Sequence, residues 1–454
     1  MFAFPTDNAG RTRLLPASIP FRFFAAASAF QLAAWLLLAL ADGLPEGGAG
    51  GLGPGVAVLH LFTLGSLAMT AIGASLQLLP VALVQSVRPP RLAAAVWWLL
   101  VPGVALLCAG MALRDPALAI AGALPVAVAL ALHAVLLVTL LVGAKRQRAL
   151  TWHAWLALAC LAATIVSGPA LVLHYRLGWL ADPGGVALAH LMLAGYGFMG
   201  LLATGFSYLL LPMFAVAKGP GEDLQRRVLA VLAASLLVGV VLALADVPRG
   251  WLAMPAASAA AAAAVHAWQL QRTLARRRNR EGPWSRMLMR AGWICMLASL
   301  VVGAALAAGA GAVGTVGTVG TVGVVGATPA RLGLVFVALM VPGWLLSFEL
   351  AVLLRILPFL SAVHAKLRGG RMPALPAVVR PSLAWAVAGL HLAALALLLA
   401  GLSLGEEHAV RAAGISGAAG AAALLLFQAS VWRRAGRQNA DSLIADKDRG
   451  AGCR

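Results

Sequence analysis

The sequence predicts an all-α membrane protein of twelve transmembrane helices, arranged as three pseudo-repeated four-helix units. Three observations lead to this fold class. The 454 residues are 62% hydrophobic and only 11% charged. The apolar residues form blocks of twenty or more that are separated by short, arginine-rich connectors. One of these blocks recurs along the chain. A soluble core does not reach this apolar content, whereas a polytopic helical protein requires it.

Each apolar block is long enough to cross the hydrocarbon layer as a helix. We treat residues 1–454 as a single membrane domain, with residues 433–454 as a cytoplasmic tail. The first apolar block is a full span without a clear cleavage site, so no cleavable signal peptide is expected. The predicted spans are 18–42, 55–84, 91–113, 116–144, 150–173, 184–216, 226–246, 249–272, 286–310, 331–362, 381–404 and 409–432.

The formal charge of +19 reflects membrane topology and does not indicate a nucleic-acid partner. With the N-terminus placed in the cytoplasm, the connectors on the opposite side are poor in basic residues and the cytoplasmic ones are rich in them. This bias is the positive-inside rule, which predicts an even number of spans and two cytoplasmic termini in a bacterial inner membrane. The cytoplasmic basic residues include Arg11, Arg13, Arg22, Arg88, Arg91, Lys145, Arg146, Arg148, Arg276, Arg277, Arg278, Arg433 and Arg434.

The repeated block is HLFTLGSLAMTAIGASLQLLP at residues 60–80, with counterparts at 190–212 and 336–358. Each copy ends in proline, and a small residue lies seven positions earlier. Four spans separate successive copies, which predicts three units about a pseudo-threefold axis. The prolines and small residues are Pro80 with Gly73, Pro212 with Gly205, and Pro358 with Ala351. The units cover approximately residues 18–144, 150–272 and 286–432.

Two low-complexity segments and the four cysteines suggest no chemistry of their own. Residues 314–323 are expected to form a flexible external loop, and the alanines of 256–265 should let neighbouring helices approach closely. No two cysteines have CxxC spacing, so neither a disulfide framework nor a thiolate metal site is predicted. The cysteines are Cys108, Cys160, Cys295 and Cys453.

Two histidines lie at the head of repeated blocks. His60 and His190 are each placed a turn or two inside the external end of a span, at equal depth and in adjacent units. Neutral imidazole is a ligand for haem iron, copper or zinc, and an ionisable group within a membrane marks a functional site by default. The alternative is an imidazole that only hydrogen-bonds a neighbouring helix. Recurrence favours ligation, with Thr63 and Tyr196 as neighbours that tune the site.

The other histidines differ in depth. His391 lies mid-span without charged neighbours and is the next candidate for a cofactor ligand, with simple packing as an equal alternative. His133 and His266 lie in the cytoplasmic half, too deep to share a site with His60. The remaining histidines are expected near the membrane boundaries, where an imidazole is uninformative. They are His153, His174, His364 and His408.

A carboxyl group is predicted inside the tenth span. Glu349 lies near mid-membrane, six residues before Arg355. A carboxyl group without a partner at that depth is expected either to be protonated or to line a wet cavity as a station on a proton or ion path.

The pattern of His60, Gly73 and Pro80 on the second of twelve spans resembles the second helix of the catalytic subunit of haem-copper oxidases and nitric oxide reductases. Those subunits also consist of three four-helix arcs. The resemblance implies that His60 is an axial haem ligand and that His190, on the sixth span, is a copper ligand. The opening PFRFF at residues 20–24 also resembles the NnrS family, divergent twelve-span relatives that contain haem and copper and are linked to nitric oxide stress.

The sequence departs from the oxidase pattern at several positions. The seventh span has no histidine pair, the tenth lacks the two haem-ligating histidines, and Tyr196 follows His190 by six residues instead of four. The dinuclear centre is therefore incomplete, and a complete terminal oxidase is not predicted. Whether the chain is an enzyme stays open.

The sequence thus favours a haem- or copper-binding membrane protein with a role in redox or nitric oxide response. Its expected partners are the lipid bilayer and an electron-transfer protein of a respiratory chain. Two alternatives remain. One is a secondary transporter that uses the carboxyl group of Glu349. The other is an assembly protein that keeps the fold and has lost its cofactors.

Overall fold

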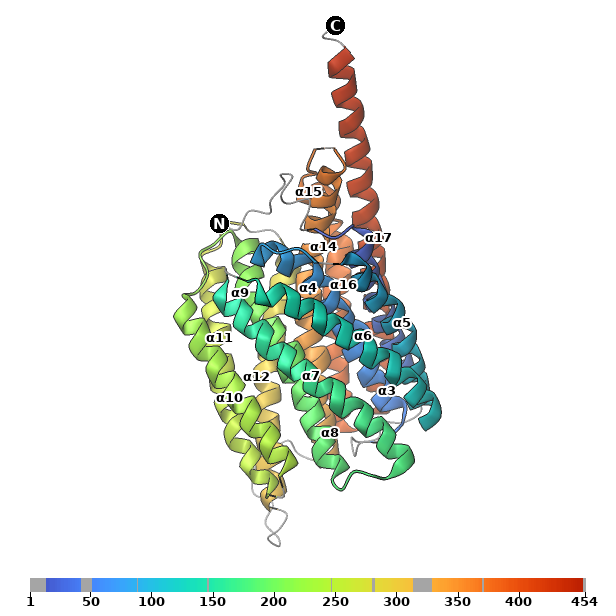
Figure 1. The fold of residues 1–454 in the computed structure, drawn as a ribbon, viewed down its shortest axis with the longest axis vertical. Coiled ribbons are helices and arrows are strands. Elements are labelled where there is room, and N and C mark those ends of the chain that lie inside the picture. Colours follow the sequence, from blue (N-terminus) through green and yellow to red (C-terminus); the bar gives the residue numbers. More distant parts are fainter. Residues whose placement is uncertain are drawn as a thin grey trace.

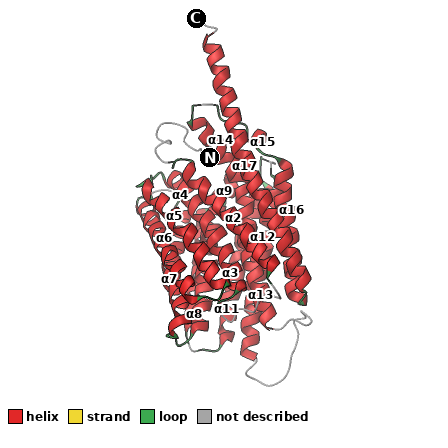
Figure 2. Cartoon of the chain, turned by 90° about the vertical axis from the view of Figure 1, so that its right-hand side faces the viewer, coloured by secondary structure: helices red, strands yellow, loops and turns green. Residues whose placement is uncertain are grey.

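The computed structural model describes residues 14–41, 51–87, 89–144, 147–245, 247–279, 282–312, 329–369 and 371–451. Within these residues every regular element is a helix. The helices lie side by side in a single bundle (Figures 1 and 2). Helices α4, α9 and α14 finish at the end of the bundle from which α17 projects, which we call the α17 end. Helices α3 and α8 begin at the opposite end.

The element bounds follow the predicted spans closely. In chain order the helices are α2 Ser18–Leu40, α3 Pro54–His60, η1 Leu61–Ala68, α4 Met69–Leu83, α5 Pro90–Ala112, α6 Pro116–Val142, α7 Arg148–Leu177, α8 Pro183–Met192, η2 Leu193–Gly200, α9 Leu201–Ala215, α10 Glu222–Leu244, η3 Arg249–Leu252, α11 Ala253–Ala275, α12 Pro283–Ala312, α13 Pro329–Ala338, η4 Leu339–Leu346, α14 Ser347–Leu367, α15 Leu375–Val378, α16 Pro381–Leu404 and α17 Glu407–Ala451.

Eleven helical stretches among the described residues are long and apolar enough to cross a membrane, so the chain is a polytopic membrane protein. The stretch predicted at 249–272 forms a 23-residue helix, α11, but it is not one of the eleven. Alanine, which fills its first half, is only weakly apolar. Its second half carries His266, Gln269 and Arg272.

The outer surface of the bundle is apolar, as a lipid-facing surface must be. Large hydrophobic side chains are exposed on many helices, among them Trp98, Val166, Leu237 and Ile294, each at least 65% exposed. A soluble protein rarely leaves so much apolar surface in contact with water. These side chains therefore face the hydrocarbon of a bilayer.

Three of the long helices contain a π-helical segment of eight residues in the same place. Segments η1, η2 and η4 each end twelve residues before a proline, at Pro80, Pro212 and Pro358. The three segments contact one another inside the bundle. π-helical turns are rare and are frequent at functional sites.

Glycine lets each π-helical segment pack closely against a neighbouring helix. A Cβ at Gly65 would lie 2.6 Å from Cβ of Phe30 on α2. A Cβ at Gly197 would lie 2.7 Å from Sγ of Cys160 on α7, and the corresponding contact of Gly343 is Cβ of Cys295 on α12 at 2.9 Å. Each glycine precedes its proline by fifteen residues.

Gly73 and Gly205 lie seven residues before Pro80 and Pro212. They allow the same kind of close helix packing nearer the α17 end. A Cβ at Gly73 would lie 2.8 Å from Cβ of Phe23, and a Cβ at Gly205 would lie 2.8 Å from Cβ of His153. These contacts again join α4 to α2 and α9 to α7. Small residues at helix contacts are the usual means of close packing in membranes.

The C-terminal helix is longer than the predicted twelfth span, 409–432. Helix α17 continues without a break from Glu407 to Ala451 and projects beyond the other helices (Figures 1 and 2). Its sequence past residue 432 contains no proline, so nothing stops the helix where the apolar residues end.

Several features that the sequence singled out lie outside the described residues. They are the glycine-rich segment 314–323, Arg11, Arg13, Arg88, Lys145, Arg146 and Cys453.

We expect Gly197→Leu to destabilise the bundle, because the added side chain would have to displace Cys160 from the contact between η2 and α7. Overpacking of this kind typically costs about 1–3 kcal/mol. Gly389→Leu is the matched control, since a Cβ at Gly389 meets nothing within 4 Å. Thermal unfolding in detergent should show a lower Tm for Gly197→Leu alone. Equal Tm values for the two variants would contradict the close contact.

Candidate functional site

The structure brings His60 and His190 together from separate helices. His60 is the last residue of α3, and His190 lies near the end of α8. Their ring centroids are 6.5 Å apart and their planes differ by 21°. The rings are too far apart to touch face to face. A metal ion bound by both rings requires each Nε2 to point to it at a distance of about 2.0–2.1 Å.

Hydrogen bonds hold both rings through the same nitrogen. Nδ1–H of His60 donates to the carbonyl oxygen of Val56 at 2.9 Å. Nδ1 of His190 lies 2.9 Å from Oγ of Ser167, whose own hydrogen goes to the carbonyl oxygen of Ala163 at 2.9 Å. While the Ser167 hydrogen is bonded to Ala163, Nδ1–H of His190 is the donor in this contact. With Nδ1–H used in each ring, Nε2 carries the free lone pair that a metal ligand needs.

A cavity of about 90 Å³ adjoins both rings. Its walls come from α3 with η1, from α5, α6 and α7, and from α8 with η2. They are mainly apolar and include the thioethers of Met111 and Met199. Gly168 lies against the His190 ring, where a Cβ would be 3.2 Å from Cε1. Pockets for drug-sized molecules measure about 300–1,000 Å³, so this cavity is smaller than those and has room for an ion with a small ligand.

Among the described residues, no third His, Cys, Asp or Glu completes a metal-binding group with this pair. The two imidazoles are therefore the only strong protein ligands of these four types that the described chain offers here. Thr63 lines the same cavity, and its hydroxyl donates to the carbonyl oxygen of Leu59 at 2.9 Å.

His391 does not join the pair. It lies on α16, and its Nε2 is 2.8 Å from Oγ of Ser347 at the start of α14. Its Nδ1 is buried and makes no hydrogen bond within the described part of the chain. Depth alone suggested that His391 could share a cofactor with His60 and His190, but the helix carries it to a different contact.

Glu349 is buried between helices of different predicted units. Its side chain is 6% exposed. The hydroxyls of Ser66 and Thr70 both donate to its Oε1, at 3.0 and 2.8 Å. Oε2 is buried, and among the described residues it has no hydrogen-bond partner. One carboxyl oxygen is thus held by the long helix Pro54–Leu83, which also carries His60, while the other is left to bind a proton or a cation.

Arg355 forms no ion pair with Glu349. Its Nη2 donates to the carbonyl oxygen of Phe214 at 3.1 Å, and its guanidinium lies 4.9 Å from the centre of the Phe214 ring. It therefore caps the end of α9, where backbone carbonyl groups lack partners within the helix.

Tyr196 was expected beside the His190 site and lies elsewhere. Its hydroxyl is 2.8 Å from Oγ of Ser299, and its ring faces a second, larger cavity that the imidazole pair does not touch. Tyr196 belongs to the π-helical segment η2, which lies beyond His190 in the chain and presents this side chain to a different neighbour.

Two histidines expected near the membrane boundaries are buried among other side chains. His153 is 0% exposed and lies with Tyr208 and His266 in a row of rings, whose successive centroids are 5.8 and 4.8 Å apart. His364 is 6% exposed, and its Nε2 lies 3.2 Å from Nε2 of Gln77. The position of His153 near the end of its predicted span did not indicate that its side chain is buried.

No model of a protein family matches this chain, and a search of curated proteins found no relative. The chemistry open to the protein therefore follows from its own side chains. These are an imidazole pair at a small apolar cavity, a buried carboxyl group with one free oxygen, and a larger apolar cavity.

Proposed function

We propose that this chain is a copper-binding integral membrane protein, distantly similar to the catalytic subunit of haem-copper oxidases, with a role in redox or nitric oxide response. The observation that carries the proposal is the 6.5 Å separation of the His60 and His190 rings beside a common cavity. Both rings are fixed through Nδ1, which leaves Nε2 of each for the metal.

The surroundings of the pair favour copper over haem. The cavity of about 90 Å³ is small, and Met111 and Met199 line it. Imidazole binds copper well, and soft thioether sulfur favours Cu(I). A bound copper ion would supply one-electron redox chemistry. The apolar walls would keep bulk water from the ion, and the bonds to Val56 and Ser167 would keep the rings oriented.

The proposal includes twelve spans in three four-helix units, with α11 as the eighth span. Two features support the repeat. The π-helical segments precede Pro80, Pro212 and Pro358 by the same interval, and the glycines within them contact α2, α7 and α12. The basic connectors favour two cytoplasmic termini in a bacterial inner membrane. An electron-transfer partner from a respiratory chain would deliver or accept the electron.

We expect purified protein to contain about one copper ion per chain, and His60→Ala or His190→Ala to lose it. Each substitution removes one of two imidazole ligands. His408→Ala is the matched control, because His408 is exposed, and it should retain the copper. Metal analysis by mass spectrometry, together with an absorption spectrum for haem, provides the measurement. Stable, metal-free wild-type protein without a haem band would overturn the proposal and favour a cofactor-free assembly protein.

Glu349 supports a second candidate function, a secondary transporter that carries protons or another cation. The specific observation is the buried Oε2 without a partner among the described residues, on a carboxyl group that Ser66 and Thr70 hold through Oε1. An intramembrane carboxyl group between helices of different units is a typical ion-binding group of transporters.

We expect Glu349→Gln to abolish any proton-coupled flux while the protein stays folded. The amide oxygen can still accept the hydrogen bonds of Ser66 and Thr70, but the side chain can no longer bind or release a proton. Flux into proteoliposomes under a pH gradient is the measurement, with Glu407→Gln at an exposed position as the control. Wild-type flux in Glu349→Gln would exclude this role.

A further inference from the structure

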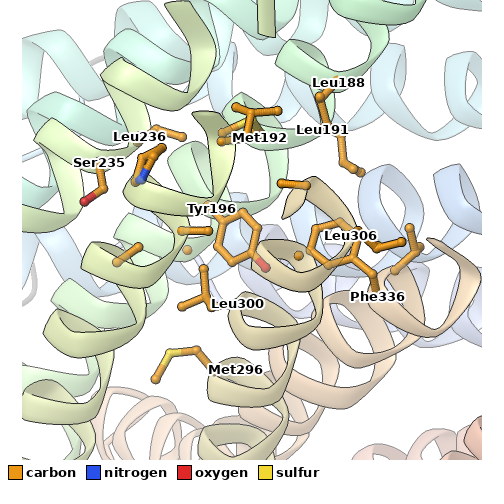
Figure 3. A pocket seen from close by; sticks show the side chains of 18 of the residues that line it. Leu188, Leu191, Met192, Tyr196, Ser235, Leu236, Met296, Leu300, Leu306 and Phe336 are labelled. Atoms are coloured by element: carbon orange, nitrogen blue, oxygen red, sulfur yellow. The ribbon is translucent and has the colours of Figure 1, made fainter. Parts of the chain in front are cut away.

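A second cavity, of about 660 Å³, lies among α8, α10, α11, α12 and α13 and the segments that continue them (Figure 3). Its volume falls within the range of pockets for drug-sized molecules, about 300–1,000 Å³. Neither the imidazole pair nor Glu349 lines it. The cavity is therefore separate from the candidate copper site and from the candidate ion-binding carboxyl group.

The cavity runs along the helices from one end of the bundle toward its middle. On α13 and η4 its wall begins at Ala330 and ends at Trp344, roughly 20 Å further along the helix at about 1.5 Å per residue. Ala330 at the start of α13 and Arg249 at the start of η3 mark its outer end, opposite the α17 end. The hydrocarbon core of a bilayer is about 30 Å thick, so the tails of one leaflet span about 15 Å. The cavity is thus deep enough for a whole lipid tail.

Small side chains on α11 leave this space open. Ala256, Ala259 and Ala263 line the cavity, and their intervals of three and four residues place them on one face of the helix. All three belong to the alanine-rich segment 256–265. On α13, a Cβ at Gly333 would meet no atom within 4 Å. The low-complexity segment of α11 therefore forms one wall of the cavity.

The wall is mainly apolar. Leucine, alanine and methionine side chains make up most of it, and Figure 3 shows Tyr196 between Met192, Leu300 and Phe336. The Tyr196 ring centroid lies 6.3 Å from that of Phe336. Water would find few polar partners over most of this wall, and an empty space would deprive the wall of dispersion contacts. A hydrocarbon chain, which the bilayer supplies, restores those contacts.

Arg249 places a positive charge at the outer end of the cavity. Its side chain is 35% exposed. Nη1 donates to the carbonyl oxygen of Ala243 at 2.6 Å, and Nη2 donates to Oδ2 of Asp182 at 3.4 Å. A guanidinium has five N–H hydrogens, so others remain for an acceptor outside the chain, and its planar fork matches the geometry of phosphate. Because lipid headgroups lie at the edge of the hydrocarbon layer, Arg249 can hold the phosphate of a lipid whose tail lies in the cavity.

We propose that the cavity binds a membrane phospholipid, with one acyl chain against α10, α11 and α12 and the phosphate at Arg249. The alanines of α11 make room for the chain, and the rings of Tyr196 and Trp344 lie where the chain ends. The guanidinium distinguishes a phospholipid from an apolar molecule that lacks an anionic group. This site does not rest on copper at the imidazole pair, so either proposal can fail alone.

The first experiment maps the bound chain with a photoreactive phospholipid. The full-length protein in phosphatidylcholine nanodiscs is irradiated with a phosphatidylethanolamine that carries a diazirine near the end of one 16-carbon chain, and mass spectrometry identifies the labelled residues. We expect label on Met296 and Leu300, which line the cavity from α12 and are 2% and 7% exposed. Ile294 and Val301 on the same helix are 67% and 61% exposed, so they face the bilayer and report labelling by bulk lipid.

Filling the cavity should remove the specific label. Ala259→Trp places a large side chain in the cavity and should lower the labelling of the two cavity residues of α12 at least tenfold relative to its two lipid-facing residues. Leu237→Trp, at an exposed position on α10, is the matched control and should leave this ratio unchanged. Ala256→Phe is a second cavity-filling variant if Ala259→Trp does not fold. Wild-type protein without label on the cavity residues, or a ratio insensitive to both filling variants, would overturn the proposal.

The second experiment tests the headgroup. A hydrocarbon with the same chain and diazirine but no headgroup is compared with the phospholipid probe. The labelling ratio should be about tenfold higher for the phospholipid, as a hydrogen bond to a charged group allows. Arg249→Gln should remove this difference, whereas Arg249→Lys keeps the positive charge and should retain most of it. An equal or higher ratio for the hydrocarbon in the wild-type protein would show an apolar ligand in place of a phospholipid.

Discussion

The close approach of three π-helical segments inside the bundle is the constraint on which the rest of the structure depends. Within a bilayer every backbone polar group must be bonded inside the protein, so a chain can change its helical register only by keeping all of its hydrogen bonds. A π-helical turn changes the register and keeps the backbone hydrogen bonds. Gly65, Gly197 and Gly343 let these segments pack closely against the neighbouring helices. The chemically interesting groups flank these segments. His60 directly precedes η1, His190 lies just before η2, and Glu349 follows η4.

The two cavities differ in the chemistry of their walls. In the smaller cavity Gly168 lies against the imidazole of His190, whereas Gly303, beside the larger cavity, lies against the phenyl ring of Phe336. A phenyl ring has no lone pair to offer a metal ion, whereas a neutral imidazole has one. A single architecture thus provides a compact polar site and a roomy apolar one.

The sequence predicted the helices well because the thickness of a bilayer fixes how long each apolar block must be. It also brought His60 and His190 to the same level, since both stand at the head of a repeated block. Prediction from the sequence failed where a contact depends on the direction in which a side chain points around the helix axis. The depth of a side chain does not determine which neighbouring helix it faces. His391, on the regular helix α16, contacts Ser347, and Tyr196, within the π-helical segment η2, contacts Ser299. The larger cavity was beyond prediction because five helices contribute to its wall.

The continuous helix α17 has a mechanical consequence. Its 45 residues make a rod roughly 67 Å long, about twice the thickness of the hydrocarbon layer. Its last turns, near Ala451, therefore stand clear of the other helices of the bundle. Because the rod has no break, any tilt of its apolar part moves its far end by a proportionally larger distance.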